Sequence, residues 1–331
     1  TKMSGVQKER LLRYLIARYA AYPQIFWQIV NDAHYAPDEL NQPDQPDEKG
    51  VPRAPAYPNN IAMAREVGEY FKQHDPWRHP LSTGHARRVP FQFGAEDWAT
   101  YIHLEDLHDL GAAQYEQYHR FAKPVFLGED RYEQDYQPDR APTDMRYFQR
   151  RLFWAWLLAG GSANYGGRCW TVVPYSQTGR AAATHPHAAN KGLTFTSQLT
   201  GLDSVRFIRD YFTRRTIELS DFEPDHRLVS DPDQRPVAQH LKLMRRGTDE
   251  YLIYHPNAAA EGRETKPDTA RRVRLRLDLR KAHGRFTVEW YRAEDGVAQK
   301  GVAIEGGREI ELISPFTGHD VVLRLRKNAR Q

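Results

Sequence analysis

The sequence predicts an α/β protein in which a parallel sheet with helical crossovers is followed by an all-β sandwich. Apolar segments of strand length alternate with helical segments as far as about residue 214. Polar residues follow directly after several of these strands. From about residue 215 the pattern changes to short strands separated by turn residues, which is typical of a sandwich. We therefore expect two domains, residues 1–214 and 215–331.

Composition limits the class of protein. The chain has 331 residues, of which 40% are hydrophobic and 27% charged, as in a globular protein. Its longest uncharged apolar run, Leu152 to Ala159, is too short to cross a bilayer. The net charge of +4 is small beside 47 basic and 43 acidic residues, which disfavours nucleic acid as a partner. The single Cys169 excludes an intrachain disulfide.

Five helices and five strands are predicted in the first domain. Apolar residues three or four positions apart predict helices at about 5–21, 60–74, 111–121, 143–159 and 201–213. Apolar runs predict strands at about 25–30, 80–83, 101–104, 124–127 and 163–166, the first of them buried. Such a sheet either closes into a (β/α)₈ barrel or stays doubly wound. No strand is followed by a glycine-rich phosphate fingerprint, which disfavours the doubly wound nucleotide fold.

The second domain is predicted to contain strands only. They lie at about 240–243, 250–254, 271–279, 286–290, 309–313 and 321–325. Arginine recurs at nearly every second position between Arg271 and Arg280, so we expect these side chains to form the solvent face of a strand. The aromatic content of 12% exceeds the needs of a core and predicts flat surfaces on which sugar rings stack.

Two carboxylates stand at the ends of predicted strands. Asp32 ends the first strand of the chain, and Glu129 ends the strand at 124–127. Hydrolysis of a glycosidic bond needs a proton donor at the leaving oxygen and a carboxylate at the anomeric carbon. Rigid strand ends suit carboxylates whose pKa values are driven apart by their surroundings. A role in capping or in a loop is the alternative for both residues.

Three segments resemble a known group of enzymes. Residues 26–32, FWQIVND, resemble the fourth-strand signature of clan A glycoside hydrolases. Residues 123–129, KPVFLGE, resemble the seventh-strand signature around the nucleophile, and residues 160–166 followed by Trp170 resemble the eighth strand. In this order, with residues 222–225 opening a β domain, they resemble the apiosidase-like glycoside hydrolases. In that family a small sandwich, sometimes labelled collagen-binding, follows the barrel.

The resemblance implies roles for four of these residues. Most clan members have Glu at the position of Asp32, whereas apiosidase-like members are known to use Asp there. Asp32 would be the acid/base. Glu129 would be the nucleophile, with retention of configuration. Asn31 would hold the hydroxyl next to the anomeric carbon, and His103 would hydrogen-bond near Glu129.

Other residues are weaker candidates for the site. Trp170 is predicted to be a sugar platform, with a core tryptophan as the alternative. His85 is predicted to bind substrate, with a structural histidine at a strand end as the alternative. Glu105 lies two residues beyond His103 in a less apolar context and is not selected. Asp130 and Glu133, which flank the nucleophile, are expected to be solvated or to support it.

No cofactor and no metal are predicted. The pair His185 and His187 has no evident third ligand for zinc. The acidic loop at 38–48 lacks the residue order of a calcium loop, so a solvated lid is the better interpretation. A Ser/His/Asp triad is disfavoured because the Gly-x-Ser-x-Gly elbow is missing.

The resemblance also implies that the barrel extends beyond these residues. If the strand ending at Asp32 is the fourth, three βα units of roughly 90 residues in all would precede it. We therefore expect this chain to hold about strands 4–8, with a longer polypeptide or a second chain completing the barrel. No signal peptide is predicted at Thr1, while the family implies an extracytoplasmic location.

The expected function is that of a retaining, exo-acting glycoside hydrolase. Its substrate would be a plant or microbial polysaccharide or an oligosaccharide derived from one. The alternative, from a different class, is a non-catalytic carbohydrate-binding protein that uses the same aromatic cleft. Product formation from aryl glycosides distinguishes the two.

Overall fold

The computed structural model describes residues 3–30, 59–84, 91–105, 111–129, 145–165, 201–233, 241–260, 262 and 265–328. Two compact units are present. The first comprises Thr1–Asp106 and Gln117–Glu129, and the second comprises Leu107–Glu116 and Asp130–Gln331. The first is mixed α/β, whereas the second is rich in strands.

Helix α1 (Gly5–Tyr19) begins at a capping box. The Ser4 hydroxyl accepts from the Gln7 amide, and the Gln7 side chain accepts from the Ser4 amide. Both bonds satisfy amides that have no partner within the helix, which fixes where the helix starts. Of the predicted apolar stripe, Leu12 and Ile16 are buried.

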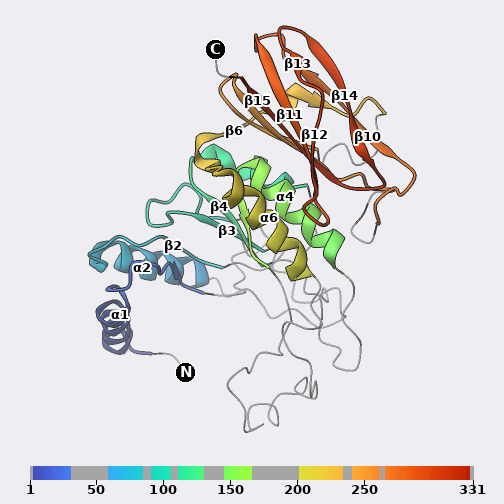
Figure 1. Cartoon of the computed structure of the whole chain (residues 1–331). Helices are drawn as coiled ribbons and strands as arrows, with labels where there is room; N and C mark the ends of the chain where they lie inside the picture. Colours follow the sequence, from blue (N-terminus) through green and yellow to red (C-terminus); the bar gives the residue numbers. More distant parts are fainter. Residues whose placement is uncertain are drawn as a thin grey trace, which may run out of the picture. The chain divides into compact units, whose positions relative to one another are not determined.

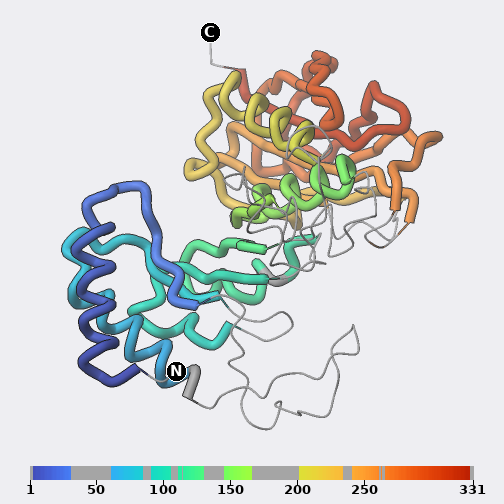
Figure 2. Tube along the Cα trace, turned by 90° about the horizontal axis from the view of Figure 1, so that it is seen from below, coloured from blue at the N-terminus to red at the C-terminus, as the bar shows by residue number. Residues whose placement is uncertain are grey.

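Helix α2 (Asn59–His74) lies alongside α1, as Figures 1 and 2 show. It buries Ala64, Val67 and Phe71, which stand three and four positions apart and therefore share one face. The other helical segments among the described residues are α3 (Ala113–Tyr118), η2 (His119–Phe121), α4 (Arg146–Ala159), α6 (Gly201–Arg215), η3 (Leu219–Asp221) and η4 (His226–Leu228).

Two pairs of parallel strands form the centre of the first unit. They are β1 (Trp27–Gln28) with β2 (Leu81–Ser82), and β3 (Ile102–Glu105) with β4 (Val125–Glu129). The Thr100 amide, just before β3, donates to the Leu81 carbonyl over 2.8 Å and so connects the two pairs. All four strands therefore follow one another in chain order, with their carboxyl ends at one edge.

The predicted buried strand at 25–30 is wrong in two respects. Only Trp27 and Gln28 are in strand conformation, and Phe26 is 55% exposed. Phe26 contacts the rings of Tyr101 and Phe126 edge-on, which covers one side of it only. An apolar run in the sequence does not distinguish a strand enclosed on both faces from one with an open face.

The described residues of the second unit form two sheets, and the short strand β5 (Ser162–Ala163) belongs to neither of them. The strands of the two sheets are β6 (Glu223–Pro224), β7 (Val229–Ser230), β8 (Lys242–Arg246), β9 (Glu250–His255), β10 (Arg272–Asp278), β11 (Arg285–Arg292), β12 (Ala298–Lys300), β13 (Ile304–Glu305), β14 (Glu309–Thr317) and β15 (Val321–Lys327). The larger sheet has the order β12-β11-β15-β9-β8-β6, with β13 also paired to β11, and the smaller has the order β14-β10-β7. The sequence did not predict the short strands β6, β7, β12 and β13.

The central strands of the larger sheet are buried on both faces. Residues of β10 and β14 from the smaller sheet share a core with one face, to which β9 contributes Tyr251 and Ile253. Helices α4 and α6 cover the other face, to which β9 contributes Leu252 and Tyr254. Because successive side chains of a strand point to opposite faces, β9 needs apolar or aromatic residues at every position from Tyr251 to Tyr254. This explains why its sequence shows no alternation.

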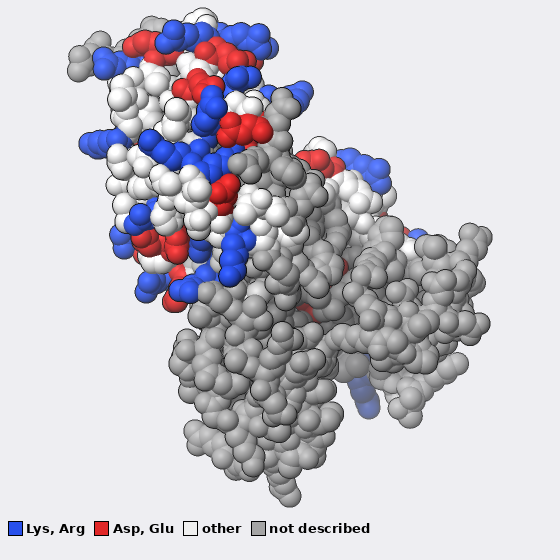
Figure 3. All heavy atoms as spheres, turned by 90° about the vertical axis from the view of Figure 1, so that its right-hand side faces the viewer, with Lys and Arg blue, Asp and Glu red and all other residues white. Residues whose placement is uncertain are grey.

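The arginine-rich strand β10 has the predicted solvent face. Arg274 and Arg276 lie on this face and pair with Glu309 and Glu311 of β14. In Figure 3, basic and acidic side chains lie interspersed over the described part of the surface that faces the viewer. The prediction is wrong for Arg271, which is buried and bound to Asp231 over 2.7 Å.

Helix α4 is buried on nearly every side. It contains two buried arginines, and Arg150 forms an ion pair with Asp320. With 14 residues it is also shorter than a membrane span. Within the described residues, no helix has the length and apolar character that spanning a membrane would require.

Candidate active site

The carboxyl ends of the parallel strands meet in the first unit. The Gly84 amide, after β2, donates to the Val30 carbonyl, after β1, over 2.7 Å. A Cβ atom added to Gly84 would lie 3.0 Å from Oε1 of Glu105, the last residue of β3. Strand β4 pairs with β3 and ends at Glu129. Polar groups from neighbouring strands are therefore held close together at this edge.

A β-bulge in β4 sets the position of Glu129. His103 and Leu104 of β3 pair with Phe126 and Leu127 of β4, but Glu105 pairs with Glu129 and not with Gly128. Gly128 is thus the additional residue on the bulged strand. Bulges re-aim side chains and are common beside active sites. Here the bulge brings Glu129 into register with Glu105.

The His103 imidazole fills the space beside this bulge. His103 is 3% exposed, and its Nε2 atom would lie 1.8 Å from a Cβ atom on Gly128. Its Nδ1 atom lies 3.9 Å from Oε1 of Glu105. The ring also packs against Phe126 with centroids 5.8 Å apart. The imidazole is therefore held between a buried carboxylate and the backbone that precedes Glu129.

The two carboxylates of this site differ in access. Glu105 is 1% exposed, whereas Glu129 is half-buried. A group that attacks a substrate has to be reachable, and Glu129 meets this requirement. Glu105 is enclosed and can act only on its neighbours. The arrangement therefore suits a nucleophile supported by an enclosed acid and an imidazole.

The structure describes two of the six predicted site residues. His103 and Glu129 lie on neighbouring strands, at positions brought together by the bulge. The other four, Asn31, Asp32, His85 and Trp170, lie outside the described residues. Val30 and Gly84, which directly precede Asn31 and His85, are described and hydrogen-bonded to each other.

Sequence reasoning missed Glu105. Its place two residues beyond His103, in a less apolar context, disfavours it as a catalytic acid, yet its side chain is enclosed in the structure. The signal was the spacing His103-x-Glu105, because residues two apart on a strand share a face. Ile102 and Leu104 are buried on the opposite face. The alternation predicts Glu105 beside His103 once the strand is placed.

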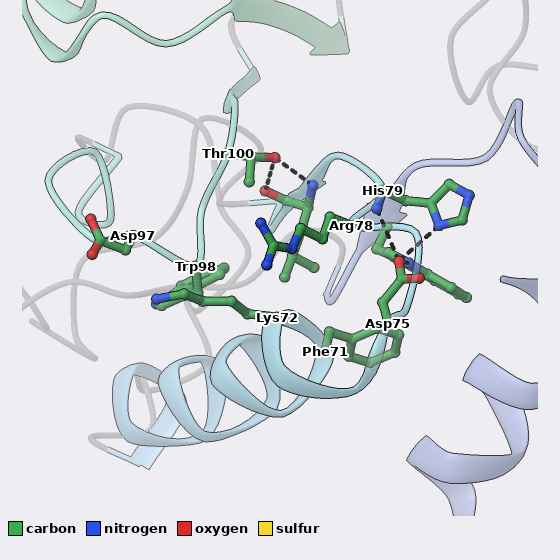
Figure 4. A pocket seen from close by; sticks show the side chains of 10 residues that line it. Phe71, Lys72, Asp75, Arg78, His79, Asp97, Trp98 and Thr100 are labelled. Atoms are coloured by element: carbon green, nitrogen blue, oxygen red, sulfur yellow. Dashed lines mark hydrogen bonds and ion pairs between the residues drawn. The ribbon is translucent and has the colours of Figure 1, made fainter.

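A separate cavity of about 320 Å³ lies at the opposite ends of the strands. It is lined by Trp27, Phe71, Lys72, Asp75, Arg78, His79, Leu81, Asp97, Trp98 and Thr100 (Figure 4). Trp27 and Leu81 are the first residues of β1 and β2. In parallel α/β sheets, ligands and catalytic groups gather at the carboxyl ends. This cavity is therefore not the predicted active site.

A hydrogen-bond network holds one wall of that cavity. The Asp75 carboxylate accepts from Trp27 Nε1 over 2.9 Å and from the backbone amides of Trp77 and His79. The His79 ring points toward it, with Nδ1 2.8 Å away (Figure 4). Burial alone would raise the pKa of Asp75, but these hydrogen bonds outweigh it and the pKa lies below its usual value.

Most described tryptophans belong to the core. Trp98, Trp154, Trp156 and Trp290 are all buried. The expectation that aromatic residues form sugar-stacking surfaces is wrong for these four. Trp77 is 71% exposed and does not belong to the core. Within the described residues, no three His, Cys, Asp or Glu side chains are grouped so as to hold a metal ion.

The fold is similar to that of solved glycoside hydrolases. One structure described as a glycoside hydrolase matches with a TM-score of 0.68 at 15% identity, over 99% of this chain and 70% of its own. A glycoside hydrolase family 5 protein from Bacteroides vulgatus matches with a TM-score of 0.65 at 16% identity, over 96% of this chain and 65% of its own. Comparison with curated protein sequences gives no match.

The class of protein is that of the glycosidases. Residues 1–217 match the family model described as "Apiosidase-like, catalytic domain". The chain therefore belongs to the apiosidase-like family. The matched segment ends before β6. The assignment of the two sheets of the second unit to a collagen-binding type of sandwich therefore stays a prediction.

Proposed function

We propose that the protein is a retaining, exo-acting glycosidase of plant or microbial polysaccharide, with Asp32 as acid/base and Glu129 as nucleophile. The observation that supports this most is the setting of Glu129. It ends β4 half-buried and is placed by a bulge beside the enclosed pair His103 and Glu105. A reachable carboxylate on a rigid strand end is what nucleophilic attack on an anomeric carbon requires.

The reaction would proceed in two steps. Asp32 protonates the leaving oxygen while Glu129 attacks the anomeric carbon and forms a glycosyl-enzyme. Asp32 then removes a proton from water, which attacks the same carbon and releases the sugar with retained configuration. Asn31, His85 and Trp170 would bind the substrate around these groups.

We further propose that β1 to β5 are strands 4–8 of a (β/α)₈ barrel. The two domains of the chain would then be residues 1–214, which hold this part of the barrel, and residues 215–331, which form the sandwich. The parallel order of β1 to β4 supports this, as does the greater length of the two similar glycoside hydrolases. A further segment or a second chain would supply the first three strands. The family suggests an extracytoplasmic protein.

A panel of aryl glycosides tests the function. The protein should release the aryl group from at least one member, and Glu129→Gln should lower the rate by several orders of magnitude because no covalent intermediate forms. Glu69→Gln, on the surface of α2, is the matched control and should retain activity. Saturable binding of oligosaccharides without hydrolysis of any member would instead indicate a carbohydrate-binding protein.

A further inference from the structure

Three titratable groups share one face of two neighbouring strands. His103 and Glu105 are two positions apart on β3, and the bulge places Glu129 of β4 opposite Glu105. His103 and Glu105 are 3% and 1% exposed, so little water separates them. The distance from Nδ1 of His103 to Oε1 of Glu105 is 3.9 Å. At this range and burial, the ionisation of each group depends on the others.

The pair Glu105 and Glu129 poses an electrostatic problem. Neighbouring strands lie about 4.8 Å apart, so carboxylates in register repel each other. Such a pair holds one of its members protonated unless a positive charge compensates. A nucleophile at residue 129 has to be ionised. The imidazole of His103 lies beside Glu105 and against the bulge at Gly128, where its positive charge would compensate.

We propose that Glu105 is a positioning residue, whose buried carboxylate holds the His103 imidazole protonated and oriented so that this cation keeps Glu129 ionised. The proposal rests on the proposed role of Glu129 as nucleophile. Glu105 itself is enclosed and does not touch substrate. Its effect on the reaction passes through His103.

The surroundings of His103 offer few competing charges among the described residues. Just before β3, Tyr101 donates to the Trp27 carbonyl, and burial raises the pKa of that phenol, so it is neutral. Strand β4 contributes Glu129. From the side of β2, Gly84 has no side chain and the adjacent Gln28 amide is uncharged. Burial disfavours the imidazolium, so the attraction of the two carboxylates for this cation has to exceed the cost of burying its charge.

A pH titration of the histidine ring signals by NMR tests the proposal. The signal of His103 is assigned as the one that His103→Asn removes. In the unmodified protein its pKa should lie above the ordinary value of about 6.5. Glu105→Gln should lower that pKa by about one to three pH units, and Glu105→Asp should lower it less. Glu69→Gln is the control and should leave it unchanged.

Glu129→Gln should also lower the pKa of His103. This change removes a negative charge that favours the imidazolium. A His103 pKa below 6.5 in the unmodified protein would overturn the proposal, as would equal values in Glu105→Gln and Glu69→Gln. If Glu105→Gln does not fold, the His103 pKa values of the unmodified protein and of Glu129→Gln still test the proposal. None of these titrations needs turnover, so a failed hydrolysis assay refutes the proposed function separately.

Discussion

The imidazole of His103 occupies the space that a side chain at residue 128 would need. Its Nε2 atom lies 1.8 Å from the position of a Cβ atom on Gly128. Glycine is therefore required here by close approach of a neighbouring ring. This contact links the histidine, the bulge and the backbone that presents Glu129.

Gly128→Ala should displace the His103 ring. We expect the free energy of unfolding to fall by about 1–3 kcal/mol through overpacking. Most glycosidase activity should be lost as well, because the bulge positions Glu129. Urea unfolding and aryl glycoside hydrolysis measure the two effects. Gly5→Ala, where no atom lies within 4 Å of the added Cβ, is the control. A Gly128→Ala protein as stable and active as this control would refute the contact.

Asp75→Asn should weaken the network at the opposite strand ends. At neutral pH the free energy of unfolding should fall by about 1–3 kcal/mol, because buried donors lose a charged acceptor. The folded-state pKa of Asp75 lies below 3.8, so its contribution is present above about pH 4 and is lost as pH falls further.

Chemical unfolding between pH 2 and pH 7 measures this dependence. The difference between the unmodified protein and Asp75→Asn should shrink toward low pH. Asp97→Asn is the control, since Asp97 is exposed and lines the same cavity. A difference that stays constant across the range would show that the charge of Asp75 does not contribute.

Asp320→Asn should strongly destabilise the second unit. Asp320 is buried, accepts from Nε and Nη2 of Arg150 over 2.9–3.2 Å, and accepts from the Tyr254 hydroxyl over 3.2 Å. Removing one partner of a buried ion pair leaves the other uncompensated, which costs about 3–5 kcal/mol.

The matched control for this pair is Asp249→Asn. Asp249 pairs with Lys327 at the surface, where such a contact contributes about 0–1 kcal/mol. Thermal unfolding of both variants gives the comparison. Similar losses in Asp320→Asn and Asp249→Asn would mean that the buried pair does not hold α4 on the larger sheet.

The order of elements in the first unit follows from the sequence. Helices α1 and α2 have a single apolar stripe, and their predicted bounds agree with the structure within two residues. The length and burial predicted for strand β1 are both too large, because an apolar run gives no information about which face is covered. The short strands β6 and β12 have no apolar pattern of their own and form by pairing with β8 and β11.

The candidate site was predictable only in part. Glu129 follows an apolar strand, and that position is visible in the sequence. The bulge at Gly128 is not, because it depends on the register between β3 and β4. Without the register, Glu105 looks like an ordinary polar residue at a strand end. Its burial is a property of the packed sheet.

The central claim is that Glu129 is the nucleophile. With a dinitrophenyl glycoside that the protein accepts, Asp32→Asn should form the glycosyl-enzyme normally, because this leaving group needs no protonation, and hydrolyse it slowly for lack of a base. The intermediate should therefore accumulate. Peptide mass mapping of the quenched protein should find one sugar attached to Glu129. A sugar attached to Glu105 or Glu133, or a burst of product with no adduct on any carboxylate, would contradict the claim.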